Sequence, residues 1–299
     1  MLNVEKFRGV FTALVTPLDA DGHYDAQRFQ KQIDRQIIGG VAGIVPVGTT
    51  GESPTLPAEE HLAVIKDAVD CSRGKLVVIA GTGGNSTAEA IELTQAAEKL
   101  GVDASLQVVP YYNKPSQAGL IAHFTAIAQS TKLNLILYNI PGRSGVDMLP
   151  ETVVRIVERC PNVIGIKEAS GSCDRVTELR RSIFCPFVIL SGDDSLTVPF
   201  MAAGADGVIS VVSNAVPGIV QSMVAAAEQN NFAKARNIHR ELYPLVKSLF
   251  LDGNPAGIKY ALKLMKVDSG KLRLPLVEVP EKTGAIIRAE LEKLSLIGE

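Results

Sequence analysis

The stretch NVIGIKEASGSCDRVTELRRS, residues 162–182, holds the two kinds of segment that alternate along most of this chain of 299 residues. Its first part, NVIGIKEA (162–169), is a short run of small and β-branched apolar residues, which is typical of a strand buried on both faces. Its second part, DRVTELRRS (174–182), has the spacing of an amphipathic helix. Together they predict one strand-then-helix unit.

Seven further units of this kind are predicted along the chain. The predicted strands are 9–16, 43–47, 76–83, 104–109, 133–140, 186–192 and 206–213, and the predicted helices are 25–38, 57–72, 86–101, 116–131, 149–160, 195–204 and 217–230. Strict alternation of strand and helix implies a parallel sheet. Eight units in about 220 residues match a closed (β/α)8 TIM barrel, so this α/β barrel is the predicted fold.

An open doubly wound sheet is the alternative fold. It would favour a phosphate-binding loop, but GTGGNS (81–86) lacks the third glycine of the GxGxxG pattern. The alternation stops after about residue 230, where helices are predicted at 231–251, 254–267 and 283–294. We therefore predict a barrel catalytic domain over 1–229 and a C-terminal α-helical subdomain over 230–299 that packs on the barrel.

Composition excludes several functional classes. The chain is 46% hydrophobic and 21% charged with a net charge of −2, so no basic surface points to nucleic acid or acidic membranes. No apolar run reaches the roughly 18 residues of a membrane span, and no signal peptide is expected. The four cysteines form no CxxC pair and the four histidines no HExxH motif, so no metal site is predicted. Scattered cysteines favour the reducing cytoplasm.

Lys167 ends the strand in the opening stretch. In a (β/α)8 barrel the active site lies at the carboxyl ends of the strands, which is where this lysine falls. Side chains alternate along a strand, so Gly165 shares its face, and we expect the glycine to leave space there. Burial lowers the pKa of a lysine, and a neutral amine can form a Schiff base. The alternative is a lysine that reaches solvent or pairs with Glu168.

Other polar residues follow neighbouring predicted strands. Tyr138 ends the strand before that of Lys167, close enough for its phenol to transfer protons to a carbinolamine, although it could equally be a core aromatic residue. Thr49 and Thr50 offer hydroxyl and N–H groups that suit a carboxylate, or ordinary turn chemistry. Arg143 could hold a second carboxylate in two hydrogen bonds, or be a solvated charge.

These segments together resemble a known enzyme family. GTTGES (48–53), YNIP (138–141) and GIKEAS (165–170) occur in the order and at the intervals of the class I pyruvate aldolases of the dihydrodipicolinate synthase and N-acetylneuraminate lyase type. The resemblance extends from TPL (16–18) to NPAGIKYAL (254–262). It implies that Lys167 forms a Schiff base with pyruvate and that no cofactor is needed, because the imine is the electron sink.

The resemblance also implies roles for other residues. Tyr138 is the acid/base, and Thr49 hydrogen-bonds it. Tyr112, contributed by a neighbouring subunit, completes a proton relay to solvent, which implies an oligomer, usually a homotetramer built as a dimer of dimers. The implied substrate-binding groups are Thr50, for the pyruvate carboxylate, and main-chain groups of Gly192 and Ile209.

Arg143 selects a branch of the family. In YNIPGRSG (138–145) it occupies the place of an arginine typical of the lysine-biosynthesis branch, in which pyruvate condenses with aspartate semialdehyde on the diaminopimelate pathway. The second substrate brings a carboxylate that needs a cation, whereas a sugar acid would need a row of hydrogen-bonding side chains. The alternatives are a sibling aldolase for N-acetylneuraminate or a keto-deoxy sugar acid, and a non-catalytic barrel that senses a keto acid.

Members of this branch are often inhibited by lysine at the dimer interface, so the resemblance implies an allosteric site. One histidine of some sensitive members is replaced by Ala58, and partial inhibition is therefore expected. Glu89 could also be explained by a capping box with Ser86, and His61 by a surface helix position. The matching positions are Ser53, Pro54, His61, Asn85, Glu89 and Tyr111.

Overall fold

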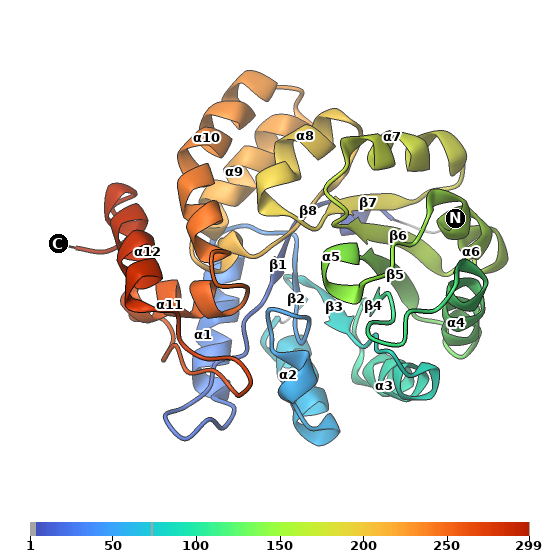
Figure 1. Ribbon diagram of the computed structural model, residues 1–299, viewed down its shortest axis with the longest axis horizontal. Coiled ribbons are helices and arrows are strands. Elements are labelled where there is room, and N and C mark those ends of the chain that lie inside the picture. The colour runs from blue at the N-terminus through green and yellow to red at the C-terminus, as the bar shows by residue number, and fades with distance from the viewer. Residues whose placement is uncertain (1–3, 73, 299) are drawn as a thin grey trace.

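The computed structural model describes residues 4–72 and 74–298, and within these ranges eight parallel strands close into a barrel (Figure 1). Because β1 pairs with β8, the sheet has no open edge; the (β/α)8 prediction is confirmed and the doubly wound alternative is wrong. The strands are β1 (Gly9–Ala13), β2 (Gly43–Val45), β3 (Val77–Gly81), β4 (Ala104–Val108), β5 (Asn134–Asn139), β6 (Val163–Glu168), β7 (Val188–Ser191) and β8 (Gly207–Ser210).

Helices surround the barrel, and their ends follow local capping chemistry. The Asp25 carboxylate accepts a hydrogen bond from Arg28 N, and Ser86 accepts one from Glu89 N. The α-helices of the barrel, ending with the one that follows β8, are α1 (Ala26–Ile38), α2 (Ala58–Ser72), α3 (Thr87–Leu100), α4 (Gln117–Gln129), α5 (Pro141–Ser144), α6 (Pro150–Arg159), α7 (Cys173–Ser182), α8 (Thr197–Ala202) and α9 (Pro217–Glu228). Four short 3-10 helices are η1 (Glu5–Phe7), η2 (Ser53–Thr55), η3 (Asp194–Leu196) and η4 (Val212–Asn214) in the described ranges.

The chain after the barrel is helical, as predicted. Helices α10 (Phe232–Leu249), α11 (Ala256–Leu264) and α12 (Glu281–Lys293) gather at one side of the barrel (Figure 1). Helix α10 packs on α8 and α9, and α12 packs on α10 and α11. The proposed division after residue 229 falls between α9 and α10, and its treatment as two domains stays a prediction. Residues 1–3, 73 and 299 of the predicted domain ranges lie outside the described residues.

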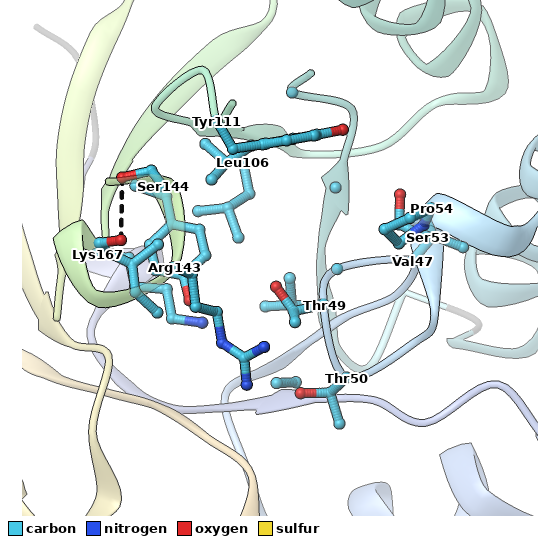
Figure 2. Close-up of a pocket in the computed structure, with 18 residues that line it drawn as sticks. Val47, Thr49, Thr50, Ser53, Pro54, Leu106, Tyr111, Arg143, Ser144 and Lys167 are labelled. Carbon is cyan, nitrogen blue, oxygen red and sulfur yellow. Dashed lines mark hydrogen bonds between the residues drawn. The ribbon is translucent and has the colours of Figure 1, made fainter. Parts of the chain in front are cut away.

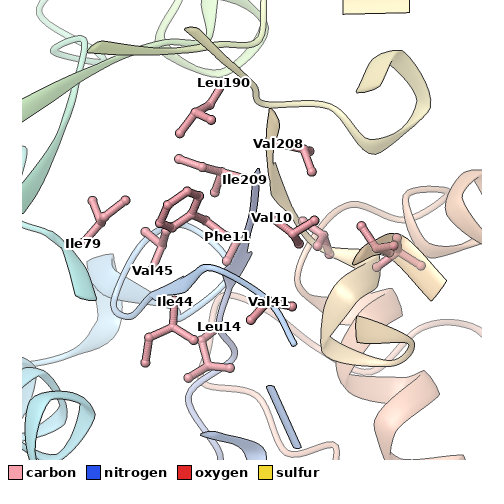
Figure 3. Close-up of a cluster of buried hydrophobic side chains, with 14 of the residues drawn as sticks. Val10, Phe11, Leu14, Val41, Ile44, Val45, Ile79, Leu190, Val208 and Ile209 are labelled. Carbon is pink, nitrogen blue, oxygen red and sulfur yellow. The ribbon is translucent and has the colours of Figure 1, made fainter. Parts of the chain in front are cut away.

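The core fills the barrel with branched and aromatic side chains. Phe11, Val45, Ile79, Leu190 and Ile209 come from five different strands and gather in one cluster (Figure 3). All five are at most 1% exposed, so the barrel interior is packed rather than hollow. Such packing leaves the carboxyl ends of the strands as the place for a site.

No helix in the described part of the chain is long and apolar enough to span a membrane.

Candidate active site

A cavity of about 240 Å³ lies at the carboxyl ends of the strands. It is bounded by the turn after β2, by the loop after β4, and by β5, α5 and β6 (Figure 2). This is the edge of a (β/α)8 barrel that normally carries the active site. The predicted site residues among its lining are Thr49, Thr50, Ser53, Pro54, Tyr111, Tyr138, Arg143 and Lys167.

Lys167 and Tyr138 lie side by side on adjacent strands. They are direct register partners of β6 and β5, and Lys167 Nζ lies 4.1 Å from the centroid of the tyrosine ring. Lys167 is 7% exposed and Tyr138 6%. Lys167 Nζ has no ion pair with any residue that the structure describes. The alternative pairing with Glu168 is wrong, because that carboxylate accepts hydrogen bonds from Asn139 Nδ2 and Ser170 N instead.

Burial favours the neutral form of both Lys167 and Tyr138. It lowers the pKa of Lys167 from 10.5 to about 7, with Asp194 opposing this shift and Arg143 adding to it. Burial also raises the pKa of Tyr138 to about 12, against the effects of Arg143 and a hydrogen bond with Thr49. Near neutral pH the site therefore holds a partly neutral amine beside a protonated phenol. That combination is a nucleophile with its own proton donor.

Gly165 does not leave the empty space that we expected next to Lys167. A Cβ at Gly165 would lie 2.3 Å from Val188 Cγ2 and 2.7 Å from the Val188 carbonyl oxygen. The missing side chain therefore allows close approach of β7, and Val188 fills the volume. Room for the lysine comes from Gly192 instead, where a Cβ would lie 3.2 Å from Lys167 Cε.

The GTTGES turn (48–53) presents donors to the cavity. Gly51 N and Ser53 N both donate to the Gly48 carbonyl, which folds the turn tightly. The N–H groups of Thr49 and Thr50 have no acceptor among the described residues. Two such N–H groups, with the adjacent hydroxyls, suit a carboxylate.

Arg143 sits on the one-turn helix α5, which the sequence did not predict. Proline begins this helix, Gly145 ends it with φ +72°, and the Ser144 hydroxyl donates to the Ile140 carbonyl at 3.0 Å. The guanidinium of Arg143 extends toward Thr50 (Figure 2). A cation thus lies across the cavity mouth from the GTTGES turn, as the hypothesis of a second carboxylate requires.

Three residues with implied catalytic or pyruvate-binding roles are not among the residues that line this cavity, namely Tyr112, Gly192 and Ile209. Tyr112 is 90% exposed and has φ +73°, a backbone conformation that is uncommon for a non-glycine residue. It lies in the loop between β4 and α4 and is directed to solvent. Ile209 lies in β8 with its side chain in the packed core. Gly192 directly follows β7, next to Lys167. None of the three positions tests the implied role, which for Tyr112 involves another subunit.

Of the six positions implied for the lysine-inhibition site, only three line the cavity. Ser53, Pro54 and Tyr111 line the cavity, and Asn85 Nδ2 donates to the Tyr111 carbonyl at 3.2 Å. The explanation of His61 as a surface residue is wrong, because its ring is buried, bonds the Gly81 carbonyl through Nε2, and has a pKa lowered by burial. Glu89 is exposed in the first turn of α3.

Sequence reasoning missed three polar residues that surround the site. Asp194 is buried, accepts hydrogen bonds from Ser210 Oγ and Val211 N, and favours the charged form of Lys167. Asn254 and Lys259 come from the C-terminal segment and bond the GTTGES turn. The contacts of Asn254 and Lys259 join residues about 200 positions apart. A single sequence gives no signal for such contacts except, for Lys259, a charged residue within an apolar helix.

Only one group of metal-type ligands was found in the described part of the chain. Asp19, Asp21 and His23 lie close together before α1, away from the cavity lining. The Asp19 carboxylate already accepts hydrogen bonds from the N–H groups of the other two, which explains the cluster as a turn. The sequence-based prediction of no metal stays a prediction.

A buried amine with no ion pair among the described residues, beside a buried phenol at the carboxyl ends of a closed (β/α)8 barrel, is the arrangement expected of a Schiff-base lyase of the class I aldolase type. Residues 6–294 match the Dihydrodipicolinate synthetase family. The chain belongs to this family, and it is therefore an enzyme.

Individual relatives agree over nearly the full length. The chain is 50% identical to a 4-hydroxy-tetrahydrodipicolinate synthase of Sulfurihydrogenibium sp. (strain YO3AOP1), over 97% of this chain and 99% of the relative. A structure of the chloride-inhibited dihydrodipicolinate synthase of Acinetobacter baumannii complexed with pyruvate is 42% identical, with TM-score 0.95 over 97% and 99% of the two chains. A Cyanidioschyzon merolae structure with lysine bound is 40% identical, with TM-score 0.95 over 98% and 99%.

Proposed function

We propose that this enzyme condenses pyruvate with aspartate semialdehyde to give 4-hydroxy-tetrahydrodipicolinate, with Lys167 as the Schiff-base residue. The observation that carries this proposal is the buried Lys167 amine, without an ion-pair partner in the described ranges, 4.1 Å from the Tyr138 ring. Relatives near 50% identity carry this activity in their names, and none of those reported above carries the name of a sialic acid or sugar-acid aldolase. Both substrates are small molecules of the diaminopimelate and lysine pathway.

The mechanism begins with the carboxylate of pyruvate at the GTTGES turn. The Thr49 and Thr50 N–H groups and the Thr50 hydroxyl hold it, which places the keto carbon near Lys167 Nζ. The neutral amine adds to this carbon, and Tyr138 donates a proton to the departing oxygen so that water leaves and the imine forms. Main-chain groups at Gly192 and Ile209 are the remaining implied contacts for pyruvate.

Carbon–carbon bond formation follows on the imine. The Tyr138 phenolate left by the dehydration takes a methyl proton from the protonated imine, which gives an enamine, and the enamine carbon attacks the aldehyde of the second substrate. Tyr138 then returns a proton to the new alkoxide, and the amino group of the second substrate displaces Lys167 as the ring closes. Arg143 binds the carboxylate of the second substrate in this proposal, because its guanidinium lies at the cavity mouth.

We further propose that the enzyme acts as a homotetramer, a dimer of dimers, in the cytoplasm. Tyr112 supports an oligomer, since an aromatic side chain that is 90% exposed on a left-handed backbone is poorly explained within one subunit. In the assembly it would complete the relay from Tyr138 and Thr49 of its neighbour. No disulfide joins the cysteines in the part of the chain that the structure describes, which is consistent with a reducing compartment.

Lysine is the proposed inhibitor. A relative binds lysine, and Ser53, Pro54 and Tyr111 place three of the six implied residues at the wall of the catalytic cavity. Lysine bound at this wall would weaken the binding of pyruvate in the cavity. A titration with lysine at subsaturating pyruvate should lower the rate partially, and an unchanged rate up to millimolar lysine would contradict this regulation without affecting the catalytic proposal.

The catalytic proposal is tested by two assays and one variant. The purified protein should consume pyruvate when aspartate semialdehyde is present and should release none from N-acetylneuraminate. Arg143→Ala should lower kcat/KM for aspartate semialdehyde by about 10- to 100-fold, the range for a lost charged hydrogen bond, while pyruvate binding is preserved. If the enzyme instead releases pyruvate from N-acetylneuraminate and Arg143→Ala leaves its kcat/KM unchanged, it belongs with the sibling aldolases.

A further inference from the structure

Asn254 connects the two groups that the proposed function assigns to substrate carboxylates. It lies between α10 and α11 and is 7% exposed. Its Nδ2 donates to Thr50 Oγ1 at 2.9 Å, and its backbone carbonyl accepts from Arg143 Nη2 at 3.2 Å. The side chain therefore acts on the pyruvate side of the cavity, whereas the backbone acts on the side of the second substrate.

The side-chain amide of Asn254 makes no other hydrogen bond in the described part of the chain. Its Oδ1 is buried and has no hydrogen-bond partner there. Burying an unpaired carbonyl costs free energy, so a position that served packing alone would favour an apolar side chain. The single hydrogen bond to Thr50 is thus the feature that accounts for an amide at this position.

This hydrogen bond fixes the direction of the Thr50 proton. A threonine hydroxyl has one proton to donate and two lone pairs that accept. Since Thr50 Oγ1 accepts from the Asn254 amide, its own proton stays available for an acceptor in the cavity. An acceptor in place of the Nδ2 amide would instead draw this proton away from the cavity and turn a lone pair toward the substrate carboxylate.

We propose that Asn254 is a positioning residue that holds the Thr50 hydroxyl as a donor to the carboxylate of the 2-keto acid. This inference rests on the proposed function, because it requires a carboxylate at the GTTGES turn. It also makes the C-terminal segment part of the substrate site rather than only a cover for the barrel. Specificity for an acid over a neutral ketone would then depend partly on a residue outside the (β/α)8 unit.

The turn and the C-terminal segment are also held together independently of the Asn254 side chain. Lys259 Nζ donates to Glu52 Oε1 at 2.6 Å and to the Thr16 carbonyl at 2.9 Å, and Arg273 N donates to Glu52 Oε2 at 3.0 Å. Substitutions of the Asn254 side chain therefore leave the main anchor of the segment in place. We expect such variants to fold.

The test compares Asn254→Asp with Asn254→Ala. Aspartate has almost the same shape but only accepts hydrogen bonds, so it should raise the pyruvate concentration for half-maximal borohydride trapping by about tenfold or more. Alanine leaves the hydroxyl free to rotate and should raise that concentration only about threefold. A purely structural role predicts the opposite order, because aspartate preserves the packing better than alanine. KM for aspartate semialdehyde should change less than about twofold in Asn254→Ala, since the backbone carbonyl that bonds Arg143 remains and no new charge is added beside the guanidinium.

A double-mutant cycle separates action through Thr50 from a general effect of the new charge. In a Thr50→Val background, Asn254→Asp should have no further effect on pyruvate trapping, since there is no hydroxyl to turn. Asn231→Asp is the matched control, because Asn231 caps α10 through its side-chain oxygen and aspartate caps equally well. That control should trap pyruvate like the parent enzyme.

The possible results lead to distinct conclusions. Equal effects of Asn254→Asp with and without the Thr50 hydroxyl, or a larger effect of Asn254→Ala, would overturn the proposal. A thermal unfolding scan of each variant identifies any loss of the folded state, and if Asn254→Asp does not fold, the cycle is run with Asn254→Ala, whose threefold effect must also disappear without the hydroxyl. If the parent enzyme itself traps no pyruvate, the proposed function has failed rather than the role of Asn254.

Discussion

Two buried lysines of this enzyme lie in opposite electrostatic surroundings. Lys259 of α11 is completely buried and pairs with the buried carboxylate of Glu52 at 2.6 Å. Lys167 of β6 is almost as buried, yet among the described residues it has an aromatic ring as its close neighbour and no ion pair. Both residues lie close to the GTTGES turn, Lys259 through its ion pair and Lys167 across the cavity.

The difference teaches how one kind of side chain serves two purposes. A buried ammonium with a carboxylate and a carbonyl as partners stays in place and ties the C-terminal helices to the barrel. A buried ammonium without such partners loses its proton more easily and becomes a nucleophile. In the proposed mechanism, it is therefore burial without an ion-pair partner among the described residues, and not burial alone, that makes the Lys167 amine reactive.

The largest expected effect is on catalysis. Lys167→Met should lower the rate by roughly a thousandfold or more, because no other residue can carry the imine. Its unfolding free energy at pH 7 should stay the same or rise, since methionine removes a buried amine that has no ion-pair partner among the described residues. Rate assays and urea unfolding on the same preparation check both expectations. A rate within tenfold of the parent enzyme would contradict the role of Lys167.

The second effect is on stability. Lys259→Met should lower the unfolding free energy by about 3–5 kcal/mol, because the Glu52 carboxylate is left buried without its partner. Urea unfolding measures this loss. The double variant Glu52→Gln with Lys259→Met should recover much of it. If the single variant is as stable as the parent enzyme, the buried pair does not have the structural role described above.

The third effect is a pH dependence of stability that Lys167→Met should remove. Its pKa falls from 10.5 to about 7 on folding, so between these pH values the unfolded chain binds a proton that the folded chain lacks. Stability from this group therefore rises with pH across this window, by roughly 1 kcal/mol per pH unit. The difference in unfolding free energy between the parent enzyme and Lys167→Met, measured at pH 7.5 and 8.5, should move in favour of the parent. A constant difference would mean that Lys167 is not shifted.

The smallest effect is expected one turn along α11 from Lys259. Lys263 Nζ pairs with Glu278 at 2.6 Å, but both side chains are more than 40% exposed. Lys263→Met should change the unfolding free energy by less than about 1 kcal/mol, because solvent screens the pair. The same urea experiment serves as the measurement. A loss as large as that of Lys259→Met would show that burial does not set the strength of these pairs.

Much of the fold could be predicted because it repeats a local pattern. Apolar strand runs and amphipathic helices define each unit, and eight units fix a barrel, as the pairing of β1 with β8 confirms. The helix α5 was not predicted, since four residues give no helical period. Gly165 was misinterpreted because a sequence shows a missing side chain but not that Val188 fills its volume.

The site could be predicted where chemistry coincides with strand ends. Lys167, Tyr138 and the two threonines follow predicted strands, and the structure brings them to one cavity. Asn254 could not be found in this way, because its contact with Thr50 depends on how the C-terminal segment returns to the barrel. The relation of Tyr112 to the site concerns a second subunit and stays a prediction.

The most direct measurement is reductive trapping followed by peptide mapping. The enzyme is incubated with pyruvate, reduced with borohydride, digested and analysed by mass spectrometry, with a sample without pyruvate as the control. We predict that Lys167 carries the reduced three-carbon adduct and that Lys259, equally buried but paired, carries none. An adduct on another lysine, or no pyruvate-dependent adduct, would contradict the claim that the unpaired buried amine is the catalytic nucleophile.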